Sequence, residues 1–151
     1  MQVEDLYGEQ ISQICRCTGN QLWRGNNRRN DWVWVKQRPG KRYGALNGRL
    51  PWQLQLLFKI KLKCDNGDMA EHSLALALTT LPENSGNMNP ISKFVHVRLA
   101  PAAVALQVFS VGNIVGCAHV IPEIADTERS RNERWVVNSH IDLATWNTVY
   151  N

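Results

Sequence analysis

The sequence predicts a mainly β fold: a small antiparallel barrel or sandwich of about seven short strands, with one or two short helices. Two observations favour this class. Short β-branched and aromatic runs with alternating polarity recur along the chain, and Gly, Pro and Asn separate them. The length of 151 residues, with 44% hydrophobic and 20% charged side chains, is that of one ordinary globular domain.

The N-terminal stretch departs from this pattern. A short helix is expected over residues 3–17, because apolar side chains recur near helical spacing from Val3 to Ile14. A basic loop rich in Gly and Asn follows. We therefore divide the chain into an N-terminal helix and basic loop, 1–27, and a single β-rich domain, 28–151.

The strands follow in chain order. They are expected at 32–36, 58–64, 73–81, 94–99, 103–111, 118–121 and 134–138. The clearest is 58–64, in which apolar residues alternate with lysines and predict one apolar and one cationic face. The Asn66–Gly67 pair that follows it is the preferred pair of a tight hairpin turn. Residues 43–53 are expected to be irregular, and one helical turn over 112–117 and a short C-terminal helix complete the prediction.

The net charge of +4 conceals an uneven distribution. Residues 1–63 hold twelve Lys and Arg against four Asp and Glu, whereas residues 64–151 hold five against nine. Concentrated basic charge is typical of a surface that meets a polyanion, and it also occurs on solvated faces that only keep a protein soluble. This asymmetry is the strongest compositional indication of function.

The candidate nucleic-acid contacts lie in the basic half. They are Arg28, Arg29, Trp32, Trp34, Lys36, Arg38, Lys41, Arg42, Lys59, Lys61 and Lys63. Trp32 and Trp34 share one face of a strand among basic residues, where their rings would stack on bases or, alternatively, belong to the core. Lys59, Lys61 and Lys63 are spaced about 6.5–7 Å apart, which suits a phosphate backbone or, equally, protection of an exposed strand from edge pairing.

No catalytic, metal-binding or cofactor-binding residues are predicted. The pairs Cys15/Cys17 and Cys117/His119 offer four soft ligands, but the Cys-x-Cys spacing is shorter than that of structural zinc sites. A hydrolase would need an activated nucleophile at a sharp turn, and the Ser-His stretch that begins at Ser139 is better explained as a turn. Phosphate-binding glycine loops are missing from the sequence as well.

The expected compartment is intracellular. Four irregularly spaced cysteines do not suggest a disulfide framework, and no secretory signal is recognisable at the N-terminus. The longest apolar runs hold about five residues, far fewer than the ~20 that span a bilayer, so no membrane association is expected.

Several segments carry a resemblance to a known family. They are Arg-Asn-Asp-Trp-Val-Trp-Val at 29–35, Tyr-Gly-Ala-Leu-Asn-Gly-Arg-Leu-Pro at 43–51, Leu-Leu-Phe-Lys-Ile at 56–60, Gly-Cys-Ala-His-Val-Ile-Pro-Glu at 116–123 and the stretch 134–147. Together they resemble the C-terminal β-rich region of uncharacterised fungal proteins related to transposon-encoded sequences. By a looser analogy of strand order, the pattern is similar to small barrels of the BAH or Tudor-like kind. The resemblance implies a nuclear accessory domain of a mobile-element protein, without catalytic residues of its own.

These observations predict a non-catalytic accessory domain that contacts nucleic acid or chromatin through its basic N-terminal half. The alternative is a protein-interaction or structural module that packs against an upstream domain of a longer chain through an exposed tryptophan face. An enzyme is not expected, and neither is a cofactor or a metal.

Overall fold

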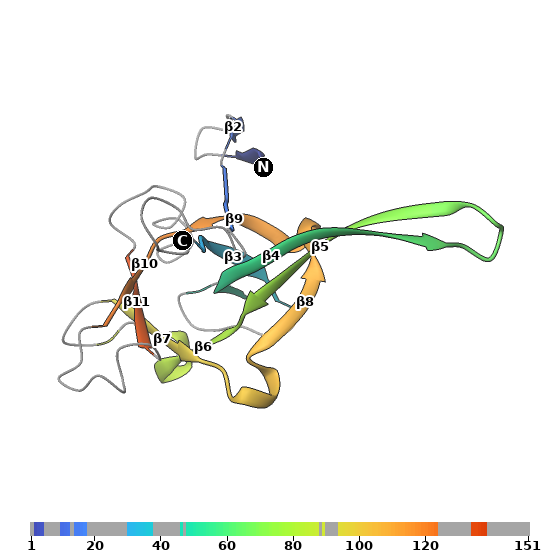
Figure 1. Cartoon of the computed structure of the whole chain (residues 1–151). Coiled ribbons are helices and arrows are strands. Elements are labelled where there is room, and N and C mark those ends of the chain that lie inside the picture. The colour runs from blue at the N-terminus through green and yellow to red at the C-terminus, as the bar shows by residue number, and fades with distance from the viewer. Residues whose placement is uncertain are drawn as a thin grey trace, which may run out of the picture.

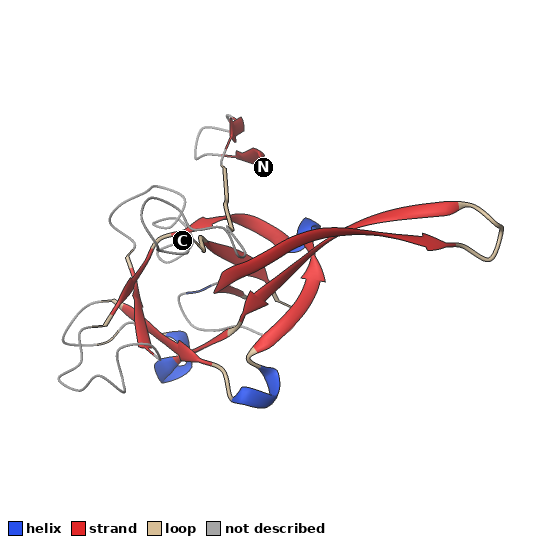
Figure 2. Cartoon of the chain, in the orientation of Figure 1, coloured by secondary structure: helices blue, strands red, loops and turns tan. Residues whose placement is uncertain are grey.

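The computed structural model describes residues 2–4, 10–12, 14–17, 30–37, 46, 48–87, 89, 94–123 and 134–138. Within these residues the chain forms three antiparallel sheets, and Figure 2 shows how strongly strands predominate. The predicted mainly β class is therefore confirmed. The described helices are three short 3-10 turns: η2 (Glu83–Gly86), η3 (Ala102–Val104) and η4 (Val111–Asn113). None of them is long and apolar enough to cross a membrane.

The larger of the two main sheets has five strands in the order β8-β5-β4-β3-β9. Its strands are β3 (Trp32–Lys36), β4 (Arg49–Lys63), β5 (Met69–Leu78), β8 (Leu106–Ser110) and β9 (Ile114–Ala118). Strands β8 and β9 form the two edges of this sheet, yet only η4 separates them in sequence, a link that spans at most about 14 Å. The sheet is therefore strongly curled (Figure 1), although hydrogen bonds do not close it into a barrel.

The second main sheet has four strands in the order β10-β11-β7-β6. They are β6 (Thr80–Pro82), β7 (Val95–Leu99), β10 (Val120–Pro122) and β11 (Arg134–Val137). Two chain segments pass directly from sheet to sheet, since β5 runs into β6 after Thr79 and β9 runs into β10 after His119. Strands that change sheets at such corners are typical of sandwiches, and the architecture is sandwich-like.

The two main sheets share one hydrophobic core. Its buried members are Val33, Trp34, Val35, Leu46, Leu50, Trp52, Leu54, Ala75, Ala77, Val95, Val97 and Val137. Trp32 of β3 meets Trp135 of β11 edge to face, with ring centroids 5.1 Å apart. The buried Thr80 hydroxyl donates a 2.6 Å hydrogen bond to the Pro51 carbonyl and so ties β6 to β4. Both contacts hold the second sheet against one end of the first.

A β-bulge in β4 decides which face of the sheet its apolar side chains occupy. Leu54 pairs with Ala77 and Leu56 pairs with Leu76, so Gln55 is an extra residue on β4. Directly opposed residues share a face, and consecutive residues of β5 occupy opposite faces. Leu54 and Leu56 therefore point to opposite sides: Leu54 is fully buried, whereas Leu56 exposes 45% of its surface.

Beyond Leu74, where the pairing with β8 ends, β4 and β5 continue as a two-stranded arm (residues 59–73) that projects from the body (Figure 1). At its tip the Gly67 N–H donates to the Cys64 carbonyl at 2.9 Å, and the Cys64 N–H donates to the Asp68 carbonyl at 2.7 Å. Gly67 has a φ of 89°. The predicted hairpin is confirmed, as a three-residue loop with a left-handed Gly at its end.

The predicted N-terminal helix is wrong. Strand β1 (Gln2–Glu4) pairs antiparallel with β2 (Gln10–Ser12), and Val3 lies opposite Ile11. A few apolar residues at irregular intervals fit either period, and β-branched side chains such as these two favour strands. The predicted division between 1–27 and 28–151 depended on that helix, and all of residues 18–29 lie outside the described part of the chain.

Two further boundaries differ from the prediction. Strand β4 begins at Arg49, so part of the stretch 43–53 that was expected to be irregular is regular strand. The helical turn expected over 112–117 is the shorter η4 followed by β9. The last predicted strand is present as β11, and the predicted C-terminal helix lies outside the described residues.

Candidate functional site

The structure describes only part of the predicted nucleic-acid surface. Five of the eleven candidate residues lie outside the described residues: Arg28, Arg29, Arg38, Lys41 and Arg42. The other six belong to β3 and β4, where their exposure and their partners are defined.

Of the two alternatives for the tryptophan pair, a stacking platform or the core, the core holds for Trp34. This side chain exposes 1% of its surface, and its neighbours Val33 and Val35 are equally buried, because β3 is covered on both sides. Trp32 is half-buried and its ring is engaged by Trp135. Stacking on a base requires an accessible ring face, which Trp34 does not have.

The three arm lysines share one exposed face, as their alternation predicts. We call this side of the arm the lysine face; it consists of Lys59, Lys61 and Lys63. The Lys59 ammonium lies 2.6 Å from a Glu71 carboxylate oxygen, in an exposed ion pair that contributes little stability. Lys61 and Lys63 have no ion-pair partner among the described residues.

The basic residues that the structure describes do not form one patch. Asp65 and Asp68 lie at the tip of the arm, so with the glutamate described above the arm holds as many acids as lysines. Lys36 is exposed, and its backbone lies opposite Arg49 in the register of β3 and β4. Arg49 is separated from Lys63 by about 46 Å along an extended strand. The β4 bulge also places Lys36 on the face of the sheet opposite the lysine face.

A broad exposed apolar surface lies on the other side of the sheet. We call it the apolar face; it consists of Leu56, Phe58, Leu74, Leu76, Leu78, Leu106 and Val108, which the register places on one side of β4, β5 and β8. Leu56 exposes 45% of its surface, and Leu106 and Val108 expose 56% each. Ile60 and Leu62 continue the row along the arm, where Ile60 lies opposite His72, and no Lys, Arg, Asp or Glu of these strands lies between them and Leu106.

The sequence carries no signal that this face would be left uncovered. The alternation over 58–64 and 73–81 correctly predicts which residues share a side, but apolar residues on one side of a strand ordinarily belong to the core. In the described part of the chain, the second sheet covers only the end of the large sheet near Trp32 and Pro51.

Strand β8 borders the apolar face as an edge strand. Its outer side pairs with no other described strand. Its sequence, Leu-Gln-Val-Phe-Ser, contains neither the charges nor the proline by which edge strands usually avoid pairing with other chains. Four of its five residues are exposed. The apolar face therefore ends at an accessible backbone edge.

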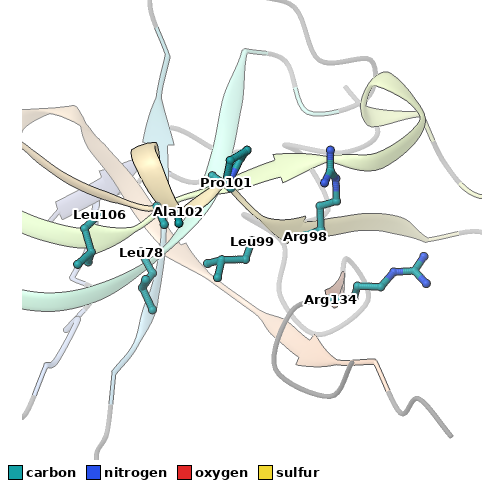
Figure 3. Close-up of a pocket in the computed structure, with 9 residues that line it drawn as sticks. Leu78, Arg98, Leu99, Pro101, Ala102, Leu106 and Arg134 are labelled. Atoms are coloured by element: carbon teal, nitrogen blue, oxygen red, sulfur yellow. The ribbon is translucent and has the colours of Figure 1, made fainter. Parts of the chain in front are cut away.

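A groove of about 690 Å³ lies at the junction of the apolar face with the second sheet (Figure 3). Leu78 and Leu106 of the apolar face line it, together with Leu99 of β7 and the segment that leads into η3. Arg98 of β7 and Arg134 of β11 line it as well. The groove is open to solvent and has a mostly apolar lining, with the two arginines at one end.

The two arginines differ in their partners. Arg134 donates to both carboxylate oxygens of Glu83, at 3.0 and 2.7 Å, and lies 3.3 Å from Glu123. These carboxylates, Glu83 first, raise the pKa of Arg134 further above its ordinary value. Glu123 also lies 3.6 Å from Nδ1 of the buried His96. Arg98 is exposed and has no ion-pair partner among the described residues.

The structure brings two of the cysteines together. Cys15 and Cys117 are half-buried, and the hydrogen bond between their thiols, together with burial, raises the pKa of Cys15. Cys17 packs against the core separately, and its backbone forms an isolated antiparallel β-bridge with Asn30. No group of three or more His, Cys, Asp or Glu side chains suited to a metal ion occurs among the described residues. The hydrolase candidate at Ser139 lies outside them.

Comparison with known proteins adds no relative from which a role could be transferred. The sequence matches no protein-family model and no curated protein, and the fold matches no solved structure.

Proposed function

We propose that this domain is a non-catalytic protein-binding module whose docking surface is the apolar face. The observation that carries the proposal is the joint exposure of Leu56, Leu106 and Val108 within a continuous, uncharged apolar surface. Soluble monomers seldom leave large apolar patches in water, and those that do usually bind a partner there. The central part of a protein interface is likewise poor in charge.

A partner protein suits this surface in both chemistry and shape. Burial of apolar area contributes about 25 cal/mol per Å². Each half-exposed Leu or Val would therefore contribute to the binding free energy when a partner covers it. The surface is a sheet face bordered by the free edge of β8, which fits an extended segment of another chain. The lysine face on the reverse of the arm stays in water when the apolar face is covered.

The test is a selection of displayed random peptides, about twelve residues long, on the intact protein. We expect enrichment on the wild type and its loss when Leu106→Glu and Val108→Glu are combined. Met69→Glu is the matched control, because Met69 exposes 60% of its surface but lies on the lysine face. Equal enrichment on the double variant, or none on the wild type, would contradict the proposal.

Nucleic acid is the second candidate partner, and the lysine face favours it. Lys61 and Lys63 project from an exposed arm without ion-pair partners among the described residues, at about the spacing of phosphates along one strand. Such contacts carry no base selectivity and weaken steeply as the salt concentration rises.

A salt-titrated binding measurement with a short DNA duplex and an RNA strand tests this candidate. Reversal of Lys59, Lys61 and Lys63 to Glu is expected to weaken binding strongly at low salt and to reduce the slope of log affinity against log salt by about 2–3. Lys36→Glu, on the opposite face of the sheet, is the matched control. An affinity that does not respond to the triple reversal would exclude the lysine face as the contact.

A further inference from the structure

We propose that the groove at the end of the apolar face selects partner segments that carry a carboxylate, and that Arg98 recognises that carboxylate. This inference rests on the proposed protein-binding function and adds the chemistry of the bound segment. The segment is extended, presents apolar side chains to the sheet, and places an Asp or Glu side chain at the end that reaches Arg98.

The two ends of the groove differ in chemistry (Figure 3). Leu78 and Leu106 form one end and belong to the apolar face, Leu99 follows, and Arg98 and Arg134 lie at the other end. A segment that follows the apolar face therefore meets a cationic end without leaving the groove. Binding sites commonly combine an apolar lining with a few polar groups that fix orientation and specificity.

Arg98 is the guanidinium at this end that is left to bind an anion. It lies directly opposite Arg134 on the neighbouring strand, and like charges in that position repel each other. Glu83 and Glu123 offset the charge of Arg134, whereas Arg98 has no ion pair among the described residues. A carboxylate from a partner would offset the charge of Arg98 and accept hydrogen bonds from its planar fork of donors.

A peptide suits the groove better than a free small molecule. Pockets for small ligands bury about 70–90% of the ligand surface, and this groove is open along the sheet. A peptide extends the contact from the groove over Leu76 and Val108, and it buries more apolar surface there than a small acid could. The two nearby carboxylates, Glu83 and Glu123, disfavour a multiply charged anion more than a single carboxylate.

The experiment repeats the displayed-peptide selection on the wild type, on Arg98→Met and on Arg98→Glu. Wild-type selection is expected to enrich apolar residues with Asp or Glu at one fixed position. The best synthetic peptide, measured by fluorescence polarisation, is expected to bind Arg98→Met about tenfold more weakly. Arg98→Glu is expected to enrich Lys or Arg at the same position instead of the acid.

Controls keep the outcomes separate. Arg98 is exposed and faces a like charge, so its variants should unfold at no lower a urea concentration than the wild type. Lys61→Met removes an exposed cation on the opposite face of the sheet and should leave peptide affinity unchanged. Apolar peptides without an acidic preference, bound equally by Arg98→Met, would overturn the role of Arg98 and leave the protein-binding proposal standing. No enrichment on the wild type would overturn the protein-binding proposal itself.

Discussion

Pro51 lies inside the longest described strand, a position where the missing N–H would ordinarily remove a ladder hydrogen bond. Here β4 has β3 on one side, and the Pro51 carbonyl faces the other side, where the buried Thr80 hydroxyl donates to it. The N–H and C=O of a strand residue point to the same edge, so the N–H that Pro51 lacks would have had no ladder partner. A sequence rule that excludes proline from strands fails at this residue for that reason.

Replacing Thr80 with valine is expected to lower the free energy of unfolding by about 1–3 kcal/mol, because the buried Pro51 carbonyl loses its donor while the side-chain shape is kept. Urea denaturation followed by far-UV circular dichroism measures the change. Thr80→Ser retains the hydroxyl and serves as the control. A valine variant as stable as the wild type would show that the hydrogen bond adds nothing.

Cys15 makes stability depend on pH at the alkaline end. Its pKa is raised above the ordinary 9.0 by the contact with Cys117 and by burial, so the folded protein holds this proton more tightly than the unfolded chain. The contribution is therefore complete below pH 9.0 and is lost as the pH rises beyond it. Between about pH 8 and about pH 10, the urea midpoint is expected to fall more steeply in the wild type than in Cys15→Ser. Parallel pH profiles of the two proteins would refute this.

At the scale of elements, the arm shows how much structure can be predicted from the alternation of apolar and polar residues. The lysine face, the turn at Asn66–Gly67 and the shared side of the apolar residues all follow from period-two patterning. The bulge does not. Even-numbered positions from Leu50 to Leu62 are apolar on both sides of it, so the sequence looks like one uninterrupted strand face. Only the paired register reveals that Gln55 divides this series between the core and the solvent.

The turn at the tip of the arm depends on the conformation of Gly67. Its φ of 89° is unfavourable for an L side chain, and a Cβ added there would meet no atom within 4 Å, so the cost of a substitution is purely conformational. Gly67→Ala is expected to destabilise the arm by about 1 kcal/mol and to speed amide hydrogen exchange in residues 59–63 and 69–73 by about fivefold. Gly67→Asn, which tolerates this conformation, is the control. Unchanged exchange in the alanine variant would contradict the prediction.

For the whole molecule, fold class was the most predictable property, because short alternating strands with turn residues between them permit few other architectures. The choice of sandwich over barrel was not predictable, since it depends on the corners at Thr79 and His119, which no local pattern marks. Within the basic half, the register separates Lys36 from the lysine face, so these described candidates lie on different surfaces, and a contact with nucleic acid stays a prediction. The resemblance to transposon-related proteins and the nuclear location stay predictions.

The shared core predicts that both main sheets unfold together. Val95, Val97 and Val137 of the second sheet belong to the same buried cluster as the residues of β3 and β4. In urea, tryptophan fluorescence, to which Trp32 and Trp135 at the contact between the sheets contribute, is expected to change at the same midpoint as far-UV circular dichroism. Two separated transitions would show that the sheets are independent units.

The three-residue loop at Gly67 also sets an order of events as the chain folds. Among the strands of the large sheet that pair with each other, β4 and β5 close the shortest loop, so they pair at the lowest entropic cost and are expected to form before β8 and β9 join them. The hairpin that forms first is thus the one that carries most of the apolar face. Before the core has closed, a newly made chain exposes both sides of this hairpin, the apolar face and the side of Leu54 that folding buries, and it is then most prone to aggregate.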